Sequence, residues 1–294
     1  MRPTTPRLIQ ALRALQHENP LGLPRTGTIP RMQRGLPERR KIKDVAKVVA
    51  VSSAKGGVGK STVAANLSLA FAKLGYRSGI LDTDIFGPSI PTLFNLSGEP
   101  RLSSNNQVLP LSNYGVKTMS MGYLVGEEAP VVWRGLMVMK ALQQLLHEVD
   151  WGGLDILVLD LPPGTGDTQL SVTQQVVLDG SLIVTTPHTL AVKDAVKGIN
   201  MFKKVNVPLL GLVQNMSLFN CPHCRTDTAV FGTNKRVQEV CREHSVDLIG
   251  DIPLHQNVGD DGQLGKPTVV SEPESERAKA FIKIAQQVGS KIGL

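Results

Sequence analysis

The sequence predicts an α/β fold with a doubly wound, mostly parallel sheet that carries helices on both faces. Short runs of apolar and β-branched residues alternate with longer segments of helical apolar spacing along most of the 294-residue chain. The runs are apolar at almost every position, which is typical of parallel strands buried on both faces. Glycine-rich and acidic motifs follow several of these runs, where open parallel sheets bind their ligands.

The expected elements follow one another in a regular order along the chain. Residues 46–53 form the first strand and lead into a glycine-rich loop. Residues 61–74 have helical apolar spacing and stop at Gly75, a residue type that often follows the end of a helix. Two later segments with helical spacing, residues 189–205 and 274–292, are also expected to form helices. Further strands are expected at residues 78–84, within 155–167, and at 180–186, 207–215 and 246–253.

The charge distribution argues against a nucleic-acid-binding protein. The formal net charge of the chain is +7, and residues 1–44 alone contain 10 Lys or Arg and 3 Asp or Glu. The other 250 residues therefore contain 22 basic and 22 acidic residues and are neutral. Because a folded nucleic-acid-binding domain is usually basic, no nucleic-acid partner is expected. No apolar stretch reaches the roughly 18 residues of a membrane-spanning helix, so no transmembrane segment is expected, whereas peripheral membrane contact stays open.

Residues 1–44 are predicted to form a basic, Pro- and Gly-rich arm that precedes a single α/β domain at residues 45–294. The first 17 residues contain three arginines, no acidic residue and apolar residues at helical spacing. This composition is typical of a mitochondrial transit peptide, and a basic tail without a targeting role is the alternative. Three cysteines and no recognisable secretory signal indicate a reducing compartment. We therefore expect the mitochondrial matrix, with the cytoplasm as the alternative location.

Residues 52–62, SSAKGGVGKST, have the form of a phosphate-binding loop between the first strand and the first helix. Glycines let the backbone turn so that its N–H groups point at phosphate oxygens, and the start of the helix adds its positive end. Lys60 is expected to reach the β- and γ-phosphates, and the Ser61 hydroxyl is expected to ligate Mg²⁺. The common pattern has one lysine and a glycine at position 54, whereas this chain has Ala54 and an additional lysine, Lys55. The predicted nucleotide-binding residues of the loop are Gly56, Gly57, Val58, Gly59, Lys60, Ser61 and Thr62.

Three aspartates follow predicted strands near this loop. Asp82 and Asp84 lie at the end of the strand in residues 78–84, where paired carboxylates suit water bound to Mg²⁺ or an attacking water. Capping of a helix or a buried hydrogen bond is the alternative role for Asp82. Asp160 ends the apolar run ILVLD in the pattern of a Walker B strand, whose aspartate holds Mg²⁺ through water.

Cys221 and Cys224 form a C-x-x-C pair, for which three interpretations stay open: half of a zinc knuckle, a redox pair, or no function. Two thiolates are half of the four ligands that zinc and iron–sulfur sites require. No second C-x-x-C pair occurs in the sequence. A twofold homodimer would supply all four ligands, two from each subunit. His223 is not expected to be a ligand, and Cys241 is expected to be a core thiol in a helix.

The segment KGGVGKST resembles the deviant Walker A motif of the family that includes MinD, ParA, ArsA and the nitrogenase iron protein. The resemblance implies a P-loop ATPase with a MinD-like or nitrogenase-iron-protein-like fold, which acts on ATP and Mg²⁺ as a homodimer. Lys55 corresponds to the signature lysine of the family, which reaches the nucleotide of the other subunit. Asp84 corresponds to the aspartate needed for hydrolysis, Asn215 to the asparagine that reads adenine, and Pro253 to a residue that flanks the base.

Four further motifs narrow the resemblance: DTDIFGPSIP, DLPPGTGD, NMSLFNCPHC and GDIPLH resemble the Mrp/ApbC group of iron–sulfur carrier ATPases, over about residues 44–292. The N-terminal arm resembles the mitochondrial NUBPL-type branch, which is linked to assembly of respiratory complex I. The resemblance implies a slow, Mg²⁺-dependent ATPase that holds a [4Fe–4S] cluster across a homodimer through the C-x-x-C pair. It also implies iron–sulfur apoproteins as clients, among them complex I subunits. One departure is Leu136, because the group often has proline after Trp133-Arg134-Gly135.

The main alternative function is a positioning ATPase of the MinD or ParA kind, acting on membrane or DNA. Its membrane form needs a short amphipathic tail rich in basic residues, whereas the last ten residues here contain one, Lys291. Its DNA form needs a basic body, and the body here is neutral. Electron transfer of the kind carried out by the nitrogenase iron protein is a third function. It is disfavoured because the ligand cysteines of that protein are well separated in sequence.

Overall fold

The computed structural model of the chain describes residues 39–124, 135–221 and 223–294. These residues belong to one compact unit, Glu38–Leu294. The unit includes residues 39–44, which the sequence prediction assigns to the arm. The Arg40 N–H donates to the Gln175 carbonyl at 2.8 Å, and Ile42 is buried. The predicted transit peptide and the rest of the arm up to residue 38 lie outside the described residues, as do Trp133 and Arg134.

The described residues contain one nine-stranded sheet in the order β3-β4-β2-β5-β1-β6-β7-β8, and β9 also pairs with β7. β3 with β4 and β7 with β8 pair antiparallel, and the other pairs are parallel. The predicted mostly parallel sheet is therefore confirmed. The strands are β1 (Val45–Ser52), β2 (Ser78–Asp82), β3 (Leu111–Asn113), β4 (Val116–Ser120), β5 (Leu154–Asp160), β6 (Gly180–Thr185), β7 (Leu209–Asn220), β8 (Asp227–Thr228) and β9 (Leu248–Leu254).

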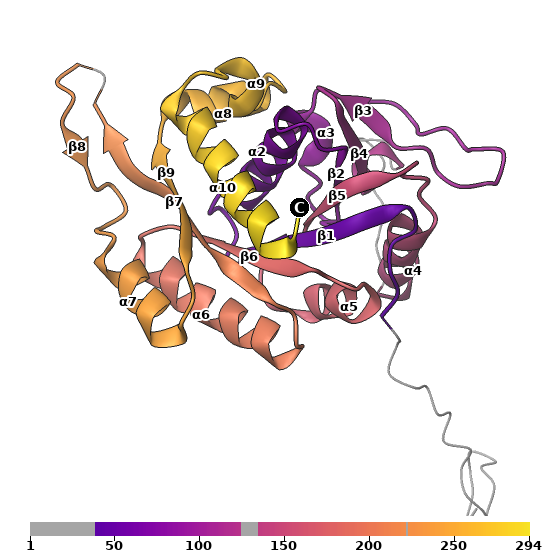
Figure 1. Cartoon of the computed structure of the whole chain (residues 1–294), viewed down its shortest axis with the longest axis horizontal. Coiled ribbons are helices and arrows are strands. Elements are labelled where there is room, and N and C mark those ends of the chain that lie inside the picture. The colour runs from indigo at the N-terminus through magenta and orange to yellow at the C-terminus, as the bar shows by residue number, and fades with distance from the viewer. Residues whose placement is uncertain (1–38, 125–134, 222) are drawn as a thin grey trace, which may run out of the picture. The chain divides into compact units, whose positions relative to one another are not determined.

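Helices cover both faces of the sheet, as predicted (Figure 1). α2 and α10 pack against each other on one face, and α4, α5, α6 and α7 lie on the other (Figure 1). Within the described ranges, no helix has both the length and the apolar character needed to cross a bilayer. The helices are α2 (Lys60–Lys73), α3 (Ile90–Leu93), η1 (Met121–Tyr123, a 3₁₀ turn), α4 (Gly135–His147), α5 (Asp167–Gln175), α6 (Thr189–Lys204), α7 (Lys235–His244), α8 (Gln256–Gln263), α9 (Thr268–Ser271) and α10 (Glu276–Ile292).

Alternate residues of β1 enter two separate hydrophobic clusters, one on each face of the sheet. Val48 and Ala50 join the cluster that contains the apolar residues of α4 to α7. Val49 and Val51 join the cluster that contains the apolar residues of α2 and α10. Burial of one such valine stabilises the fold by about 1.5–3 kcal/mol. This two-sided core therefore fixes β1 and the start of the loop that follows it.

The central part of the chain and the end of β7 differ from the sequence prediction. No element is predicted between the second strand and β5, where the structure has α3, β3, β4, η1 and α4. β7 extends to Asn220, five residues past the predicted end at residue 215. Met216 adopts a left-handed φ of 54°, and the pairing of β7 with β9 shifts between Asn215 and Phe219. This irregularity lets β7 continue and carry the chain directly into Cys221.

Candidate functional site

The loop between β1 and α2 has the backbone that a phosphate-binding loop requires. Gly57 and Gly59 have φ angles of 80° and 81°, in the left-handed region that favours glycine. A Cβ atom on Gly59 would also lie 2.2 Å from the amide nitrogen of Asn215. That nitrogen donates to the Val58 carbonyl at 2.9 Å, so β7 packs directly against the loop. Glycine at position 59 is therefore required both by its backbone angle and by the approach of β7.

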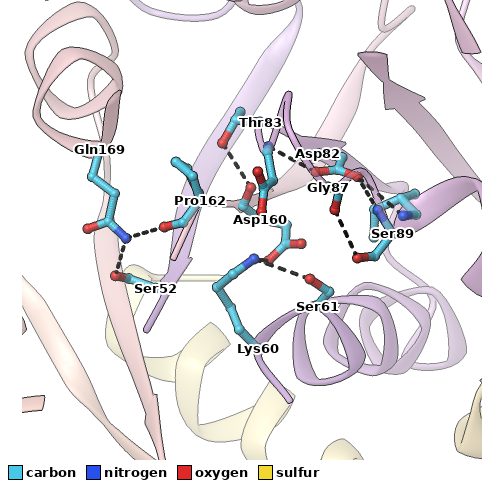
Figure 2. Close-up of polar contacts among 12 residues, drawn as sticks. Ser52, Lys60, Ser61, Asp82, Thr83, Gly87, Ser89, Asp160, Pro162 and Gln169 are labelled. Carbon is cyan, nitrogen blue, oxygen red and sulfur yellow. Dashed lines mark hydrogen bonds and ion pairs between the residues drawn. The ribbon is translucent and has the colours of Figure 1, made fainter. Parts of the chain in front are cut away.

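Lys60, Ser61 and Asp160 meet at the start of α2 (Figure 2). The Lys60 ammonium forms an ion pair with Asp160 Oδ1 and donates to Ser61 Oγ at 3.2 Å. The side chains of Lys60 and Asp160 are 7% and 0% exposed. Asp160 Oδ2 is buried and has no hydrogen-bond partner among the described residues. A free, buried carboxylate oxygen near a serine hydroxyl matches the oxygen ligands that Mg²⁺ takes, so Ser61 and Asp160 fit the predicted metal.

Asp84 belongs to the same site and comes from the loop that follows β2. It lines a cavity of about 540 Å³ together with Lys60, Ser61, Thr62 and the glycines of the phosphate-binding loop. Burial raises the pKa of the Asp84 carboxyl, and the charge of Lys60 opposes that rise. The structure thus brings together the predicted phosphate-binding residues and the predicted catalytic aspartate around one cavity. Val58 is buried next to them, and its carbonyl is occupied by Asn215.

Asp82 has a different environment from Asp84. It pairs with Asp160 across β2 and β5, and it is buried. Its carboxylate accepts hydrogen bonds from the backbone N–H groups of Asp84, Ser89 and Ile90. Burial and the neighbouring Asp160 carboxylate raise the pKa of Asp82 to about 7, and the hydrogen bonds from the amides oppose that rise. The geometry favours the hydrogen-bonding role that the sequence leaves open over the predicted role at Mg²⁺.

Three residues assigned by resemblance are not among the described residues that line the cavity: Lys55, Asn215 and Pro253. Lys55 is half-buried in the phosphate-binding loop. Asn215 pairs with Ile252 of β9, so Asn215 and Pro253 lie on neighbouring strands. The Asn215 amide already contacts the loop, and the roles of all three residues toward a nucleotide stay predictions.

The sequence does not predict two parts of the site. Gln169 of α5 donates from Nε2 to Ser52 Oγ at 3.0 Å and to the Pro162 carbonyl, which ties the loop after β5 to the end of β1 (Figure 2). The Gly164 N–H adds a bond to the Ser53 carbonyl at 2.9 Å. The second part is α8, which contributes cavity-lining residues opposite the phosphate-binding loop. Its sequence, QNVGDDGQ, is polar and contains two glycines, so helical spacing gives no signal there.

Cys221 and Cys224 lie in the turn between β7 and β8, which pair antiparallel at the edge of the sheet (Figure 1). The Cys221 N–H donates to the Thr226 carbonyl at 3.1 Å, and the Arg225 N–H donates to the Cys221 carbonyl at 2.8 Å. Cys224 Sγ lies 3.3 Å from Thr226 Oγ1. The side-chain and backbone hydrogen bonds of Thr226 lower the pKa of the exposed Cys224 thiol. We call residues 221 and 223–226 the cysteine hairpin.

The cysteine hairpin contains two free thiols, which are the predicted metal ligands. Within the described part of the chain, no group of three or more His, Cys, Asp or Glu side chains is arranged to hold a metal ion. His223 is exposed. Cys241 lies in α7, where burial raises the pKa of its thiol, so the predicted core thiol is confirmed. A site with four ligands at the hairpin would therefore need two ligands in addition to the two thiols described there.

Comparison with known proteins identifies the family to which this arrangement belongs. The model of the ParA family described as NUBPL iron-transfer P-loop NTPase matches residues 44–289, which span the described sheet and the cysteine hairpin. This chain belongs to that family. The resemblance inferred from the sequence motifs is thereby confirmed, and the cavity at the phosphate-binding loop is the candidate nucleotide site.

Curated relatives within and around the NUBPL family cover most of the chain. The mouse iron–sulfur cluster transfer protein NUBPL is 52% identical over 259 residues, which are 87% of this chain and 81% of the mouse protein. An iron–sulfur protein of Arabidopsis thaliana, required for mitochondrial NADH dehydrogenase, is 48% identical, with 83% of this chain and 78% of that protein covered. An iron–sulfur cluster carrier protein of Aquifex aeolicus is 45% identical, with 86% and 71% covered.

Solved structures confirm the fold class. A nucleotide-binding protein from Archaeoglobus fulgidus in complex with ADP aligns with a TM-score of 0.68 and 36% identity, over 81% of this chain and 93% of that chain. The cell division ATPase MinD from Pyrococcus furiosus aligns with a TM-score of 0.61 and 21% identity, over 83% and 99% of the two chains. At that level of identity the likeness to MinD shows the fold alone.

Proposed function

We propose that this protein is an ATP-dependent iron–sulfur scaffold and carrier. It holds a [4Fe–4S] cluster across a homodimer and transfers the cluster to apoproteins, with subunits of respiratory complex I among its clients. The observation that carries this proposal is the exposed cysteine hairpin, which offers two thiols at the end of the strand that contacts the phosphate-binding loop. The names of the mouse and Arabidopsis relatives support the cargo and the client.

The nucleotide site is proposed to hydrolyse ATP slowly with Mg²⁺. Lys60 contacts the β- and γ-phosphates, while Ser61 and Asp160 hold the metal, Asp160 through water. Bound Mg²⁺ would supply positive charge that neutralises the phosphates. Asp84 orients the attacking water inside the cavity that it lines with Lys60. Lys55 of each subunit stabilises the transition state at the nucleotide of the other, as an arginine finger does.

The adenine and the cluster are proposed to bind at two different points along β7. Asn215 reads the base and Pro253 flanks it from the neighbouring strand. Beyond Asn215, β7 leads to Cys221 at the base of the cysteine hairpin. Cys221 and Cys224 of two subunits together hold the cluster, which leaves with the client as cargo. A twofold arrangement satisfies the ligand count because each subunit contributes the same two thiols.

The mitochondrial matrix is the proposed location, with residues 1–17 as its import signal. Deletion of residues 1–17 is expected to leave ATP binding unchanged, because the compact unit begins at Glu38. It is also expected to abolish import into isolated mitochondria, measured by protection from added protease. Efficient import of the truncated chain would contradict this location signal.

The carrier function is tested by a transfer assay. The protein is reconstituted anaerobically with iron and sulfide, desalted, and mixed with an apoprotein that is active only with a [4Fe–4S] cluster. We expect activation of the apoprotein together with loss of the visible iron–sulfur absorption of the carrier. The Cys221→Ala and Cys224→Ala variants are matched controls and should activate nothing. Equal activation by wild type and by these variants would mean that the hairpin is not the source of the cluster.

A further inference from the structure

Asp82 accepts hydrogen bonds from both ends of the loop that carries the predicted catalytic Asp84. Figure 2 shows its contact with Ser89. Its Oδ1 accepts the backbone N–H of Asp84 at 3.0 Å. Its Oδ2 accepts the N–H groups of Ser89 and Ile90 at 2.9 Å and 3.2 Å, where the loop ends and α3 begins. Ser120 of β4 donates its hydroxyl to the same Oδ2 at 3.2 Å. One buried carboxylate thus accepts hydrogen bonds from the backbone N–H groups of Asp84 and Ile90, which are six residues apart in sequence.

We propose that Asp82 is a positioning residue for hydrolysis, which acts through the main chain of Asp84. The hydrogen bond to the Asp84 N–H fixes the backbone from which the catalytic carboxylate projects into the cavity. The bonds to Ser89 and Ile90 close the other end of the loop. This inference rests on the proposed role of Asp84 in ATP hydrolysis. It identifies Asp82 as the residue that holds Asp84 in place.

The rest of the loop explains why such an anchor is needed. At its start, the Thr83 N–H and hydroxyl both donate to the Asp160 carbonyl, at 3.0 Å and 2.8 Å. Its tip is at the surface, where Phe86 is 69% exposed. Ile85, next to Phe86, packs into the core, so core packing holds the first half of the loop. The Asp82 carboxylate adds the hydrogen bonds that hold the Asp84 backbone and the return of the loop at Ser89 and Ile90. Misplacement of a catalytic group by about 1 Å can cost roughly 10²-fold in rate.

The chemistry of the site requires a carboxylate. An ionised aspartate has two acceptor oxygens, whereas asparagine has one acceptor and one NH₂ donor. In an Asp82→Asn variant, the NH₂ group must face the N–H of Asp84 or those of Ser89 and Ile90. Two donors would then oppose each other at one end of the loop. The substitution therefore releases one anchor while keeping the size of the side chain.

The first test compares the kinetics of Asp82→Asn with those of Ser120→Ala. Asp82→Asn is expected to lower kcat by about 10- to 100-fold with KM and the Kd for ATP unchanged within about twofold, since Asp82 is not among the described cavity-lining residues. Ser120→Ala removes a contact to the same carboxylate from outside the loop. Its kcat should stay within about twofold of wild type. A wild-type kcat for Asp82→Asn, or an equal loss in both variants, would overturn the proposal.

A double-mutant cycle separates positioning from general destabilisation. In the Asp84→Ala background, Asp82→Asn should cause no further loss of the residual hydrolysis, because the side chain that it positions is gone. Multiplicative losses would mean that Asp82 acts independently of Asp84. If Asp82→Asn is not recovered folded, Asp82→Glu takes its place, since it keeps two acceptors but shifts them by one methylene. A wild-type kcat in that variant contradicts the proposal.

Hydrogen exchange tests the anchor without any catalysis. Peptides that cover residues 83–90 should exchange faster in Asp82→Asn than in wild type, while peptides from α10 should be unchanged. Unchanged exchange in residues 83–90 would contradict the anchor even if kcat falls. Should the wild-type protein hydrolyse no ATP at all, the proposed role of Asp84 fails, and the exchange result still decides whether Asp82 holds the loop.

Discussion

The nucleotide site and the cysteine hairpin lie on the same sheet but differ in how complete they are within one chain. At the nucleotide site, Lys60 and Asp160 are buried, and the phosphate-binding loop, the carboxylates and the cavity walls come from one folded unit. At the hairpin, Cys224 is exposed, Cys221 is half-buried, and a strand of two residues, β8, supports the turn. The first site is organised by the core, whereas the second projects from the sheet edge.

This difference fits two kinds of ligand. A nucleotide is bound through many small contacts, which a two-sided core can preorganise at the ends of parallel strands. A cluster that must be handed to another protein needs ligands that can be reached and released. An exposed thiol and a half-buried thiol on a hairpin meet that need, because in the proposed homodimer the other half of the site would leave when the subunits separate. β7 joins the two regions, since it contacts the phosphate-binding loop at Asn215 and ends at the hairpin.

Removal of either hairpin thiol gives the largest expected effect and separates the two regions. Cys221→Ala or Cys224→Ala should lose the cluster completely, because a homodimer of either variant keeps only two of the four thiolate ligands. ATP affinity should be unchanged, since neither cysteine is among the described residues that line the cavity. Iron content and isothermal titration with ATP measure both outcomes. Cys241→Ala, a change to a buried thiol in α7, should keep the cluster, and loss of iron in that variant would contradict the assignment.

A change at Lys60 should have the opposite effect, with loss of nucleotide binding and retention of the cluster. Lys60→Ala should weaken ATP binding by about 30-fold or more, because loss of one partner of a buried charge pair costs roughly 2–5 kcal/mol. Cluster loading per chain should remain at the wild-type level. Lys47→Ala is the matched control: Lys47 pairs with Asp179 at a half-exposed position, and its loss should leave ATP affinity unchanged. Retention of ATP binding in Lys60→Ala would contradict the site.

Lys55 is expected to couple two nucleotide sites rather than complete its own. Lys55→Ala should bind ATP within about threefold of wild type and lose roughly 10³-fold or more in kcat, the scale of a catalytic finger. Mixing it with Asp84→Ala subunits should restore activity, because a mixed dimer contains one site with Asp84 in place and Lys55 supplied by the neighbour. Steady-state hydrolysis across a titration of the two variants measures this. Mixtures no more active than their parents would argue against action between subunits.

A smaller effect concerns the reactivity of the thiols themselves. The hydrogen bonds of Thr226 lower the pKa of Cys224, whereas burial raises the pKa of Cys241. Because the thiolate is the reactive form, Cys224 in metal-free protein should react with iodoacetamide at a lower pH and several-fold faster than Cys241. Thr226→Val should slow Cys224 alone. Peptide mass spectrometry over a pH series gives each rate, and equal rates for Cys224 and Cys241 would contradict the role of Thr226.

Local signals in the sequence predicted the central strands and the phosphate-binding loop. Apolar runs and glycines report on backbone conformation at their own positions, as Gly57 and Gly59 confirm. Contacts between residues far apart in the sequence leave no such local signal in the sequence. Gln169 reaches Ser52 across 117 residues, and Asn215 reaches Val58 across 157. No periodicity or motif in the chain indicates either contact.

Asp82 shows a different limit of the sequence. A carboxylate at the end of a parallel strand suits a metal and a loop anchor equally well, so its residue type and position do not distinguish the two roles. The distinction depends on where the amides of Ser89 and Ile90 fold back, which is a property of the loop as a whole. The cysteine hairpin is similar, because C-x-x-C spacing predicts two ligands without indicating that a strand continues past residue 215 to present them.

Native mass spectrometry of the anaerobically reconstituted protein tests the central claim most directly: one chain supplies the residues that bind the nucleotide, whereas the cluster site requires two chains. With MgADP present, the monomer should carry nucleotide but no iron, and the dimer should carry one [4Fe–4S] cluster, the number that four thiolates hold. A [4Fe–4S] cluster on the monomer, or two clusters on the dimer, would contradict this account.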